Sequence, residues 1–246
     1  MAESSPGEIG YADFSRLAEA KNISKYERIG FPDSYRADHE AAIFADIDAK
    51  VTNLGATSKL VLDIGPGCSE LPHLIIKKCE EQGHKLLLID SPQMLAHLPQ
   101  KPFIEGFAGP YPGANRDLER FNGKVDVIIC YSVLHYIFAE GNVFDFLDFS
   151  LQLLAPGGQM LIGDIPNQSM RHRFFASAAG RAFHKGFIGD DSEPPLGAYT
   201  PGKLDDAAVL SLVARARNAG AHAYLVPQAS NLPMANRRED ILIRKP

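Results

Sequence analysis

The residues best suited to chemistry in this 246-residue sequence follow two short apolar runs. The first run reaches Asp63 and leads into a loop in which a proline separates Gly65 from Gly67. Glycines at such a turn let the backbone approach a ligand closely, because no Cβ stands in the way. The second run ends in Asp90, whose carboxylate can accept hydrogen bonds from both hydroxyls of a ribose, while Asp63 can hold the loop or an ammonium group. This pattern predicts a ligand that has a nucleoside and a zwitterionic tail.

The glycine loop departs from the fingerprint of dinucleotide-binding proteins. That fingerprint places a third glycine where this chain has Glu70. A carboxylate there would repel a pyrophosphate at the start of the following helix. The spacing therefore disfavours NAD as the ligand.

Alternating short apolar runs and longer amphipathic stretches predict the elements that position these residues. We expect an α/β protein with a doubly wound, Rossmann-like sheet of seven strands, mostly parallel and covered by helices on both faces. The run over 125–131 is continuous and β-rich, so it should lie near the sheet centre. The last strand should be antiparallel, because a connection of about 12 residues is short for a helical crossover. Strands are predicted over 59–64, 85–90, 101–108, 125–131, 159–164, 221–226 and 240–244, and helices over 38–54, 71–82, 91–98, 143–154 and 207–219.

Four motifs in order along the chain resemble those of the class I S-adenosylmethionine-dependent methyltransferases. They are the loop with Asp63, Gly65 and Gly67, the acid Asp90, Val133-Leu134-His135 after the central strand, and Leu154–Gly158 before the fifth. The resemblance covers residues 59–164 and 205–246. The third glycine of the family loop is Ser69 here, whose hydroxyl can cap the following helix instead.

The resemblance implies that the chain binds S-adenosylmethionine and releases S-adenosylhomocysteine. For Met94 and Phe107, packing in the core is the alternative to a contact with the adenine. The implied contacts are Asp63 at the loop or the ammonium group, Gly65 and Gly67 at the methionine part, Asp90 at the ribose, Met94 over the adenine, Gly106 and Phe107 at the adenine edge, and Tyr131 and Ser132 near the sulfonium.

His135, just past the central strand, is the candidate general base of a methyl transfer. Its reference pKa lies near neutrality, and a base contributes roughly 10²–10⁴-fold when the acceptor is a hydroxyl. Positioning the acceptor behind the methyl group contributes more, roughly 7–11 kcal/mol. The alternative is a histidine at a helix start that only packs over the cofactor.

About 100 residues lie outside the resembling core, and we expect them to select the acceptor within one methyltransferase domain. Its expected parts are an N-terminal helical cap over 1–58, a cofactor-binding core over 59–164, a substrate-side insert over 165–204, and a C-terminal helix with strands over 205–246.

Two of these parts carry candidate acceptor-binding residues. In the resembling family, N-terminal helices often close over the cofactor, so the resemblance implies that Tyr35 and Arg36 of the cap lie at the site entrance. The insert contains Arg171, His172 and Arg173, in a stretch without any acid between residues 169 and 188. Because all charged side chains of this stretch are basic, it predicts contacts with an anionic acceptor, such as a sugar phosphate or a carboxylate metabolite. The alternative is a solvated basic face. We therefore expect transfer to a small anionic molecule, with oxygen favoured as the acceptor atom.

Composition limits the binding partners, the cellular location and the metal or disulfide chemistry that we expect of the protein. A formal net charge of −5 gives no general attraction to nucleic acid or to an anionic membrane, although a local basic patch could matter. No apolar run approaches the ~18–20 residues that span a bilayer, and the first residues lack the blocks of a signal peptide, so we expect a cytoplasmic protein. Three scattered cysteines argue against a disulfide framework or a zinc site, and no carboxylate and histidine cluster predicts another metal. The expected partner is a small-molecule acceptor, with no membrane and no nucleic acid; the oligomeric state does not follow from the sequence.

Three alternative functions remain open at this point. They are an NAD-dependent oxidoreductase, a catalytically silent cofactor-binding or scaffold protein, and a nucleic-acid modifier that uses the basic insert. Glu70 counts against the first and the acidic net charge against the third. The Asp/Asn-Pro-Pro-Tyr run of methyltransferases that act on amide and base amino groups is also missing, because the chain has Tyr131-Ser132-Val133-Leu134 there.

Overall fold

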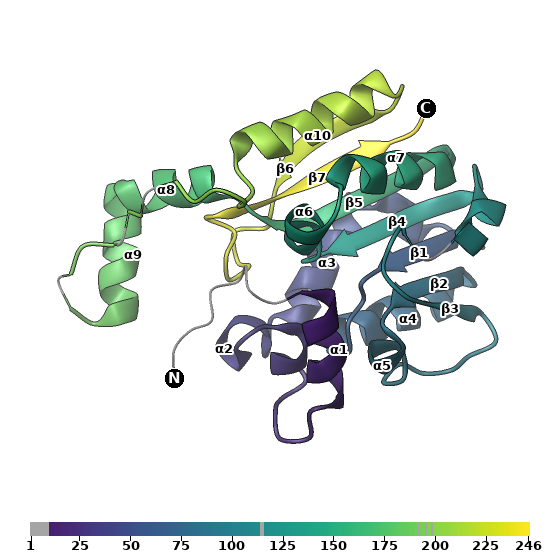
Figure 1. Cartoon of the computed structure of the whole chain (residues 1–246), viewed down its shortest axis with the longest axis horizontal. Coiled ribbons are helices and arrows are strands. Elements are labelled where there is room, and N and C mark those ends of the chain that lie inside the picture. Colours follow the sequence, from purple (N-terminus) through teal and green to yellow (C-terminus); the bar gives the residue numbers. More distant parts are fainter. Residues whose placement is uncertain (1–9, 114–115, 191, 195, 198) are drawn as a thin grey trace.

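A computed structural model describes residues 10–113, 116–190, 192–194, 196–197 and 199–246 (Figure 1). Seven strands form one sheet in the order β3-β2-β1-β4-β5-β7-β6. The first five strands pair in parallel, whereas β7 runs antiparallel to both β5 and β6, which confirms the predicted sheet. The strands are β1 (Leu60–Ile64), β2 (Lys85–Asp90), β3 (Ile104–Ala108), β4 (Val125–Tyr131), β5 (Leu154–Pro166), β6 (His222–Pro227) and β7 (Arg238–Arg244).

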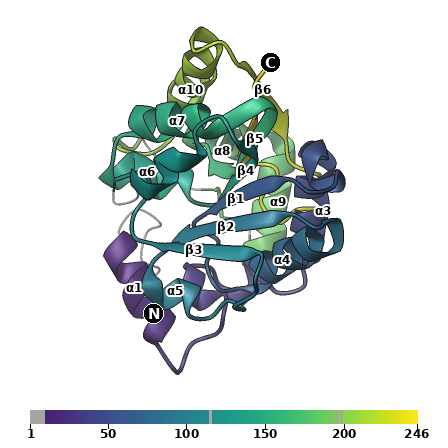
Figure 2. The ribbon, with the colours of Figure 1, turned by 90° about the vertical axis from the view of Figure 1, so that its right-hand side faces the viewer.

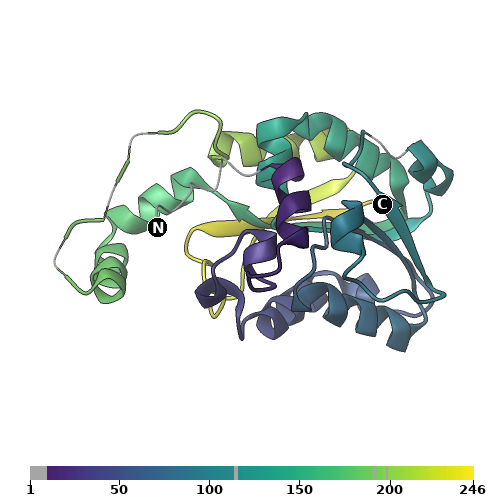
Figure 3. The same ribbon diagram turned by 60° about the horizontal axis from the view of Figure 1, so that its bottom comes forward.

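Helices cover both faces of the sheet (Figure 3). On one face lie α3 (Glu40–Lys50) and α4 (Glu70–Gln82), and on the other lie α6 (Leu134–Glu140), α7 (Val143–Leu153) and α10 (Asp206–Asn218). Successive strand residues point to opposite faces, so Val61 joins the core under α3 and α4 while Leu62 and Ile64 join the other core. The carboxyl ends of β1 and β4, where the strand order reverses, therefore form the crevice in which such sheets bind ligands.

The N-terminal segment folds across this carboxyl edge. It contains α1 (Tyr11–Glu19), the 3₁₀ turn η1 (Glu27–Ile29) and α2 (Asp33–Arg36), and a second 3₁₀ turn, η2 (Thr52–Gly55), joins α3 to β1. In Figure 2, α1 lies beside α5 (Pro92–Leu95), which follows β2. The cap thus lies where the glycine loop and Asp90 meet.

The insert after β5 forms two helices that project from the body of the molecule (Figure 1). Asn167 caps α8 (Gln168–Ala176) by accepting hydrogen bonds from the backbone N–H groups of Ser169 and Met170 at 2.9 and 3.1 Å. A single turn residue separates α8 from α9 (Ala178–Ile188). Within the described part of the chain, no helix is both long and apolar enough to cross a membrane.

Several element bounds differ from the predictions for local reasons. The predicted helix over 91–98 is the short α5, and the predicted helix over 38–54 ends at Lys50, where Asn53 turns to donate to the carbonyls of Asp126 and Gly157. The predicted third strand shortens to β3, and the predicted fifth strand extends back to Leu154, which pairs with Val125. A helix over 134–140 was not predicted, because its aromatic and β-branched residues are weak helix formers. A 3₁₀ turn, η3, covers Arg116–Phe121.

Candidate functional site

The loop between β1 and α4 has a backbone that only glycine fits. Gly65 and Gly67 have φ angles of +68° and +67°, in the left-handed region. A Cβ on Gly65 would lie 2.7 Å from Cγ2 of Val133, and one on Gly67 would lie 2.7 Å from Cγ2 of Ile29. The predicted glycine loop therefore passes close to both Val133, two residues after β4, and Ile29 of the N-terminal cap.

Two carboxyl groups lie behind this loop, of which that of Asp63 is buried and that of Asp90 is half-buried. Asp90 accepts hydrogen bonds from the backbone N–H groups of Gly67 at 3.0 Å and Ser91 at 2.7 Å. Burial raises the pKa of Asp90 to about 6 in spite of these bonds. For Asp63, burial together with the charge of Asp90 raises the pKa to about 8. A ligand that donates hydrogen bonds or brings positive charge would stabilise the ionised forms of both groups.

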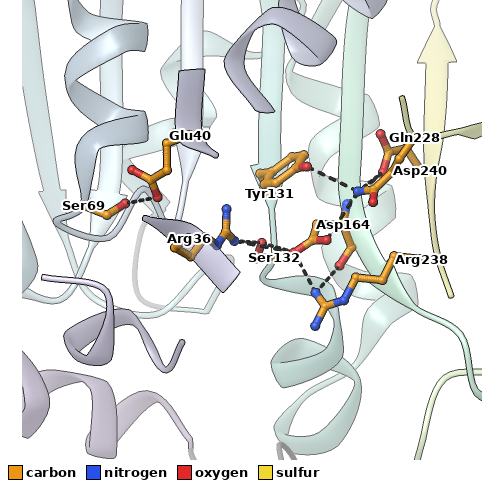
Figure 4. A network of polar contacts seen from close by, with 9 residues as sticks. All are labelled: Arg36, Glu40, Ser69, Tyr131, Ser132, Asp164, Gln228, Arg238 and Asp240. Atoms are coloured by element: carbon orange, nitrogen blue, oxygen red, sulfur yellow. Dashed lines mark hydrogen bonds and ion pairs between the residues drawn. The ribbon is translucent and has the colours of Figure 1, made fainter. Parts of the chain in front are cut away.

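The N-terminus of α4 is held by a carboxylate that the sequence did not indicate. Glu40, on α3, is 3% exposed and accepts hydrogen bonds from Oγ of Ser69 at 2.8 Å and from the backbone N–H of Leu71 at 2.7 Å. Ser69 makes no side-chain cap of its own, so Glu40 takes the capping role predicted for the serine hydroxyl (Figure 4). No local pattern could have revealed Glu40, because its partners lie about 30 positions away along the chain.

The cap covers the loop with apolar and polar contacts. Met94 is 2% exposed and packs with Cys68 and Ala18 beneath Phe14 and Ile29. Two polar contacts also hold the cap. Lys25 of the cap pairs with Glu70 at the start of α4 at 2.9 Å, and the backbone N–H of Tyr11 in α1 donates to Glu140 at the end of α6 at 3.1 Å. The cap and the glycine loop therefore form one packed unit.

The predicted adenine-edge residues lie on β3, beside β2. Gly106 pairs with Leu88, and Phe107 is buried in the core, where its ring meets Phe121 edge-on at 6.3 Å. This placement favours packing as the role of Phe107. Ala108, at the end of β3, pairs with Asp90 at the end of β2.

The carboxyl ends of β4 and β5 hold a buried group that we call the arginine–aspartate cluster: Arg36, Ser132, Asp164 and Arg238 (Figure 4). Oγ of Ser132 lies 2.5 Å from both Nη2 of Arg36 and Oδ2 of Asp164. Arg238 donates to Oδ2 of Asp164 at 2.6 Å, while Arg36 lies 3.5 Å from the same oxygen. Burial alone would raise the pKa of Asp164, but Arg238 and Arg36 hold it below its usual value.

Two members of the cluster adopt strained backbones. Ser132 has a φ of +61° and Asp164 a φ of +57°, angles that non-glycine residues rarely adopt. Such strain is found at functional sites, where the surrounding contacts enforce it. Ser132 directly follows β4, and Asp164 lies where the register of the neighbouring strand β5 shifts. The side chains of these two strained residues hydrogen-bond to each other.

A second layer of polar side chains surrounds the cluster. Gln228, after β6, donates towards Asp164, Asp240 and the hydroxyl of Tyr131 at 3.2–3.3 Å (Figure 4). Asp240 also accepts from the backbone N–H of Asp164 at 2.8 Å and pairs with Lys50 at 2.7 Å. A small cavity adjoins these groups and is lined by Tyr35, Arg36, Tyr131, Asp164, Gln228 and Met234. The structure therefore brings the predicted residues Tyr35, Arg36, Tyr131 and Ser132 together.

His135 lies in the first turn of α6, half-buried and close to these charges. Its Nδ1 atom is buried and has no hydrogen-bond partner among the residues that the structure describes, and its ring lies 3.9 Å from that of Tyr136. Burial, together with the positive charges of Arg238 and Lys203, lowers the pKa of His135 to about 3 against the opposing effect of Asp164. The imidazole is therefore neutral at neutral pH, and its surroundings in the ligand-free protein disfavour its protonation.

The basic residues predicted on the insert are exposed on α8, outside the arginine–aspartate cluster. Arg173 pairs with Asp206 through contacts of 2.5 and 3.2 Å, so its charge is largely compensated. Arg171 lies over the ring of Phe175 at 5.0 Å, and His172 is exposed. The cations that act on His135 are instead Arg238 and Lys203, which the sequence did not single out.

Comparison with solved structures identifies the architecture. A methyltransferase from Aquifex aeolicus described as S-adenosylmethionine-dependent is 14% identical, with 92% of this chain and 99% of that chain covered and a TM-score of 0.54. The plantazolicin methyltransferase, solved with S-adenosylhomocysteine and a desmethyl analogue, is 14% identical over 96% and 99% of the two chains, with a TM-score of 0.56. The 1,6-didemethyltoxoflavin N1-methyltransferase of Burkholderia thailandensis, solved with its acceptor and S-adenosylhomocysteine, is 16% identical over 98% and 92%, with a TM-score of 0.50.

The chain has the class I methyltransferase fold. At these identities the likeness establishes the fold, as the motif order had predicted. No family model and no curated protein matches the sequence. The acceptors named for the two solved complexes differ from each other, so the methyltransferase fold alone does not name an acceptor for this chain.

Proposed function

We propose that the protein is an S-adenosylmethionine-dependent methyltransferase that acts on a small anionic acceptor, with oxygen favoured as the methylated atom. The observation that carries the proposal is the pairing of two sites on one sheet edge. A glycine loop with Asp90 behind it lies at β1 and β2, and the neutral, unpartnered His135 lies beside cations at β4 and β5. Solved structures of the same fold with S-adenosylhomocysteine bound support the choice of cofactor.

The residues behind the glycine loop suit this cofactor chemically. Asp90 would accept hydrogen bonds from the ribose hydroxyls, and the ionised Asp63 would favour the ammonium group. With φ angles in the left-handed region, Gly65 and Gly67 let the loop turn sharply close to Val133 and Ile29, where a Cβ would clash. When bound, S-adenosylmethionine supplies an electrophilic methyl group on a sulfonium.

The charges near His135 support an anionic acceptor. Arg238 and Lys203 act on the imidazole and disfavour its protonation. A carboxylate or phosphate close to these two cations would offset their charge, and its own negative charge would raise the pKa of His135. The acceptor would thereby make the histidine a stronger base as it binds. Arg36, Tyr35, Arg171 and His172 remain proposed members of the acceptor wall.

His135 is proposed to take the proton that an acceptor hydroxyl loses as its oxygen bonds to the methyl carbon. The receiving atom is Nδ1, which is buried and has no hydrogen-bond partner in the described part of the chain. A base of this kind contributes roughly 10²–10⁴-fold, so most of the acceleration must come from alignment of the acceptor. Tyr131 and Ser132, fixed by Gln228 and Asp164, are proposed to form the floor of that alignment.

Calorimetric titration with S-adenosylmethionine and S-adenosylhomocysteine tests the cofactor. Both should bind, and Asp90→Asn should weaken binding at least tenfold because a charge-assisted pair with the ribose is lost. Asp148→Asn, which changes an exposed acid paired with Arg215, is the matched control and should leave affinity unchanged. Binding of NAD in place of both compounds would refute the proposal and favour an oxidoreductase.

A methyl-transfer screen against phosphorylated and carboxylated metabolites tests the acceptor. With an acceptor in hand, His135→Ala should lower kcat roughly 10²-fold or more, and Lys203→Gln should raise KM for the anionic acceptor. Near wild-type kcat for His135→Ala across pH 6–8 would remove the histidine from the mechanism. An acceptor KM unchanged by charge reversal at Arg171 would remove the insert from the acceptor wall. Cofactor binding without turnover of any acceptor would favour a silent cofactor-binding protein.

A further inference from the structure

Two arginines from distant segments meet where the insert joins the sheet. Arg171 lies on α8, and Arg237 directly precedes β7. Both guanidinium groups lie over the ring of Phe175, with their Cζ atoms 5.0 and 5.9 Å from its centroid, and Arg237 also lies 5.8 Å from the ring centroid of Phe183. Phe175 is buried, so the two arginines converge on one fixed aromatic support.

No ion pair joins either arginine to an acid in the part of the chain that the structure describes. Arg237 is half-buried, and its guanidinium donates to the uncharged amide oxygen of Asn236 at 2.8 Å. The acids at the base of the insert already have partners: Asp206 pairs with Arg173, Glu239 accepts from Asn167, and Asp164 pairs with Arg238.

The positive charge at this place is therefore not balanced by the described residues. Burial and the charges of Arg238 and Arg171 lower the pKa of Arg237 against the opposing effect of Tyr35. A guanidinium keeps its proton at any ordinary pH, so the lowered pKa reports cations that are held close together. Such an arrangement costs free energy in the ligand-free protein, and an anion that binds between the cations relieves it.

Two guanidinium groups favour one class of anion. Each presents N–H donors in a planar fork that matches the oxygens of a phosphate or a carboxylate. A phosphate ester carries a charge of about −1.5 to −2 at neutral pH, so it can offset both arginines, whereas a carboxylate can offset only one. Arg171 is exposed, so a ligand can reach the pair from solvent.

We propose that Arg171 and Arg237, with the hydroxyl of Tyr35, form a phosphate-binding site that holds a phosphorylated acceptor. This inference rests on the proposed function, which supplies the acceptor. Tyr35 also lines the small cavity beside Tyr131, so the site adjoins the proposed floor for the acceptor.

The site also connects the acceptor to the proposed base. Arg238 acts on both Arg237 and His135. A phosphate that Arg237 holds would therefore offset part of the charge that disfavours protonation of the histidine. Binding of the acceptor and strengthening of the base would then occur together.

Calorimetric titration of the full chain with inorganic phosphate, without cofactor or acceptor, tests the site. Phosphate should bind, and acetate, which carries a single charge, should bind at least tenfold more weakly. Arg171→Gln and Arg237→Gln should each weaken phosphate binding roughly tenfold, because a charge-assisted contact is lost. Tyr35→Phe should weaken it roughly threefold, because a neutral hydrogen bond contributes less.

Arg181→Gln is the matched control, because Arg181 is exposed on α9 and donates to the carbonyl of Ala176. It should bind phosphate as the unaltered chain does, and circular dichroism should show that each variant folds. Phosphate binding that both Arg171→Gln and Arg237→Gln retain, or no preference for phosphate over acetate, would overturn the proposal. If the unaltered chain did not bind phosphate but Arg237→Gln unfolded at a lower temperature, the arginines would only support the insert.

This titration needs no methyl transfer, so it separates the phosphate site from the proposed function. Binding of S-adenosylmethionine without binding of phosphate would overturn the phosphate site alone. Binding of phosphate without binding of S-adenosylmethionine would refute the proposed function, and with it an acceptor as the source of the phosphate.

Discussion

The two halves of the carboxyl edge of the sheet shift the pKa values of their acids in opposite directions. At β1 and β2, burial raises the pKa values of Asp63 and Asp90 to about 8 and about 6. At β4 and β5, Asp164 is buried as Asp63 is, yet two arginines hold its pKa below the usual value. The first pair receives little compensation from the protein, whereas Asp164 is surrounded by partners.

We call the β1–β2 side the ligand-facing half, because we propose that the cofactor binds there, and the β4–β5 side the self-contained half, because Asp164 already has its counter-charges in the protein. A buried acid without a cation is stabilised when a ligand supplies hydrogen-bond donors or positive charge. A buried acid that already holds two arginines is part of the wall, and its arginines depend on it in turn. A buried acid can therefore belong either to a ligand site or to the structural framework. The presence of cationic partners in the protein distinguishes the second case from the first.

The largest expected effect comes from breaking the self-contained half. Asp164→Asn leaves Arg36 and Arg238 buried without a counter-charge, so the free energy of unfolding should fall by about 3–5 kcal/mol. Urea denaturation followed by circular dichroism measures this loss. Asp148→Asn, which breaks an exposed pair, should change stability little. A small effect of Asp164→Asn would mean that the cluster contributes no more than a surface contact.

The next effect concerns pH and the ligand-facing half. The pKa of Asp90 is raised from about 3.9 in an unfolded chain to about 6, so its contribution to stability is fully present below pH ~4 and is lost as pH rises through 6. The loss is on the order of 3 kcal/mol, and Asp63 continues it towards pH 8. Denaturation of the ligand-free protein between pH 4 and 8 should show this decline, and Asp90→Asn should flatten it. The opposite sign holds for Asp164, whose contribution disappears on acidification. A ligand-free protein that gains stability across this range would contradict the assignment.

The smallest expected effect separates backbone strain from steric contact at the glycine loop. Gly67→Ala and Gly83→Ala each place an alanine at a φ of +67°, which costs about 1–2 kcal/mol. Only at Gly67 would the new Cβ meet a neighbour, Ile29 of the cap, whereas Gly83 has open space around it. Thermal denaturation should show a larger loss for Gly67→Ala, and calorimetry should show weaker cofactor binding for that variant alone. Equal effects at both positions would mean that the contact with the cap is unimportant.

The sequence predicted the ligand-facing half better than the other. Gly65, Gly67 and Asp90 lie next to the strands that position them, so apolar runs and turn residues were enough to place them. Arg238 bonds a residue 74 positions away, and Arg36 bonds one 96 positions away. Contacts of that span leave no local pattern.

Asp164 shows most clearly which contacts the sequence could not predict. In the sequence it is an isolated acid near the end of the fifth predicted strand, with no neighbour that suggests a partner. Its partners come from the cap, from β4, from β7 and from the residue after β6, and they meet only once the sheet has formed. Arg36 was found through the family resemblance, but its bond with Ser132 was not.

The position of β7 inside the sheet has a consequence for the growing polypeptide on the ribosome. Strands β1–β5 can pair in the order in which they are synthesised, but β6 has no neighbour until β7 exists, because β7 lies between it and β5. A nascent chain that has not yet reached Arg238 therefore leaves open the edges of β5 and β6 that β7 later covers. Unpaired edges invite association with other chains, so pauses in translation just before this point would be costly for solubility.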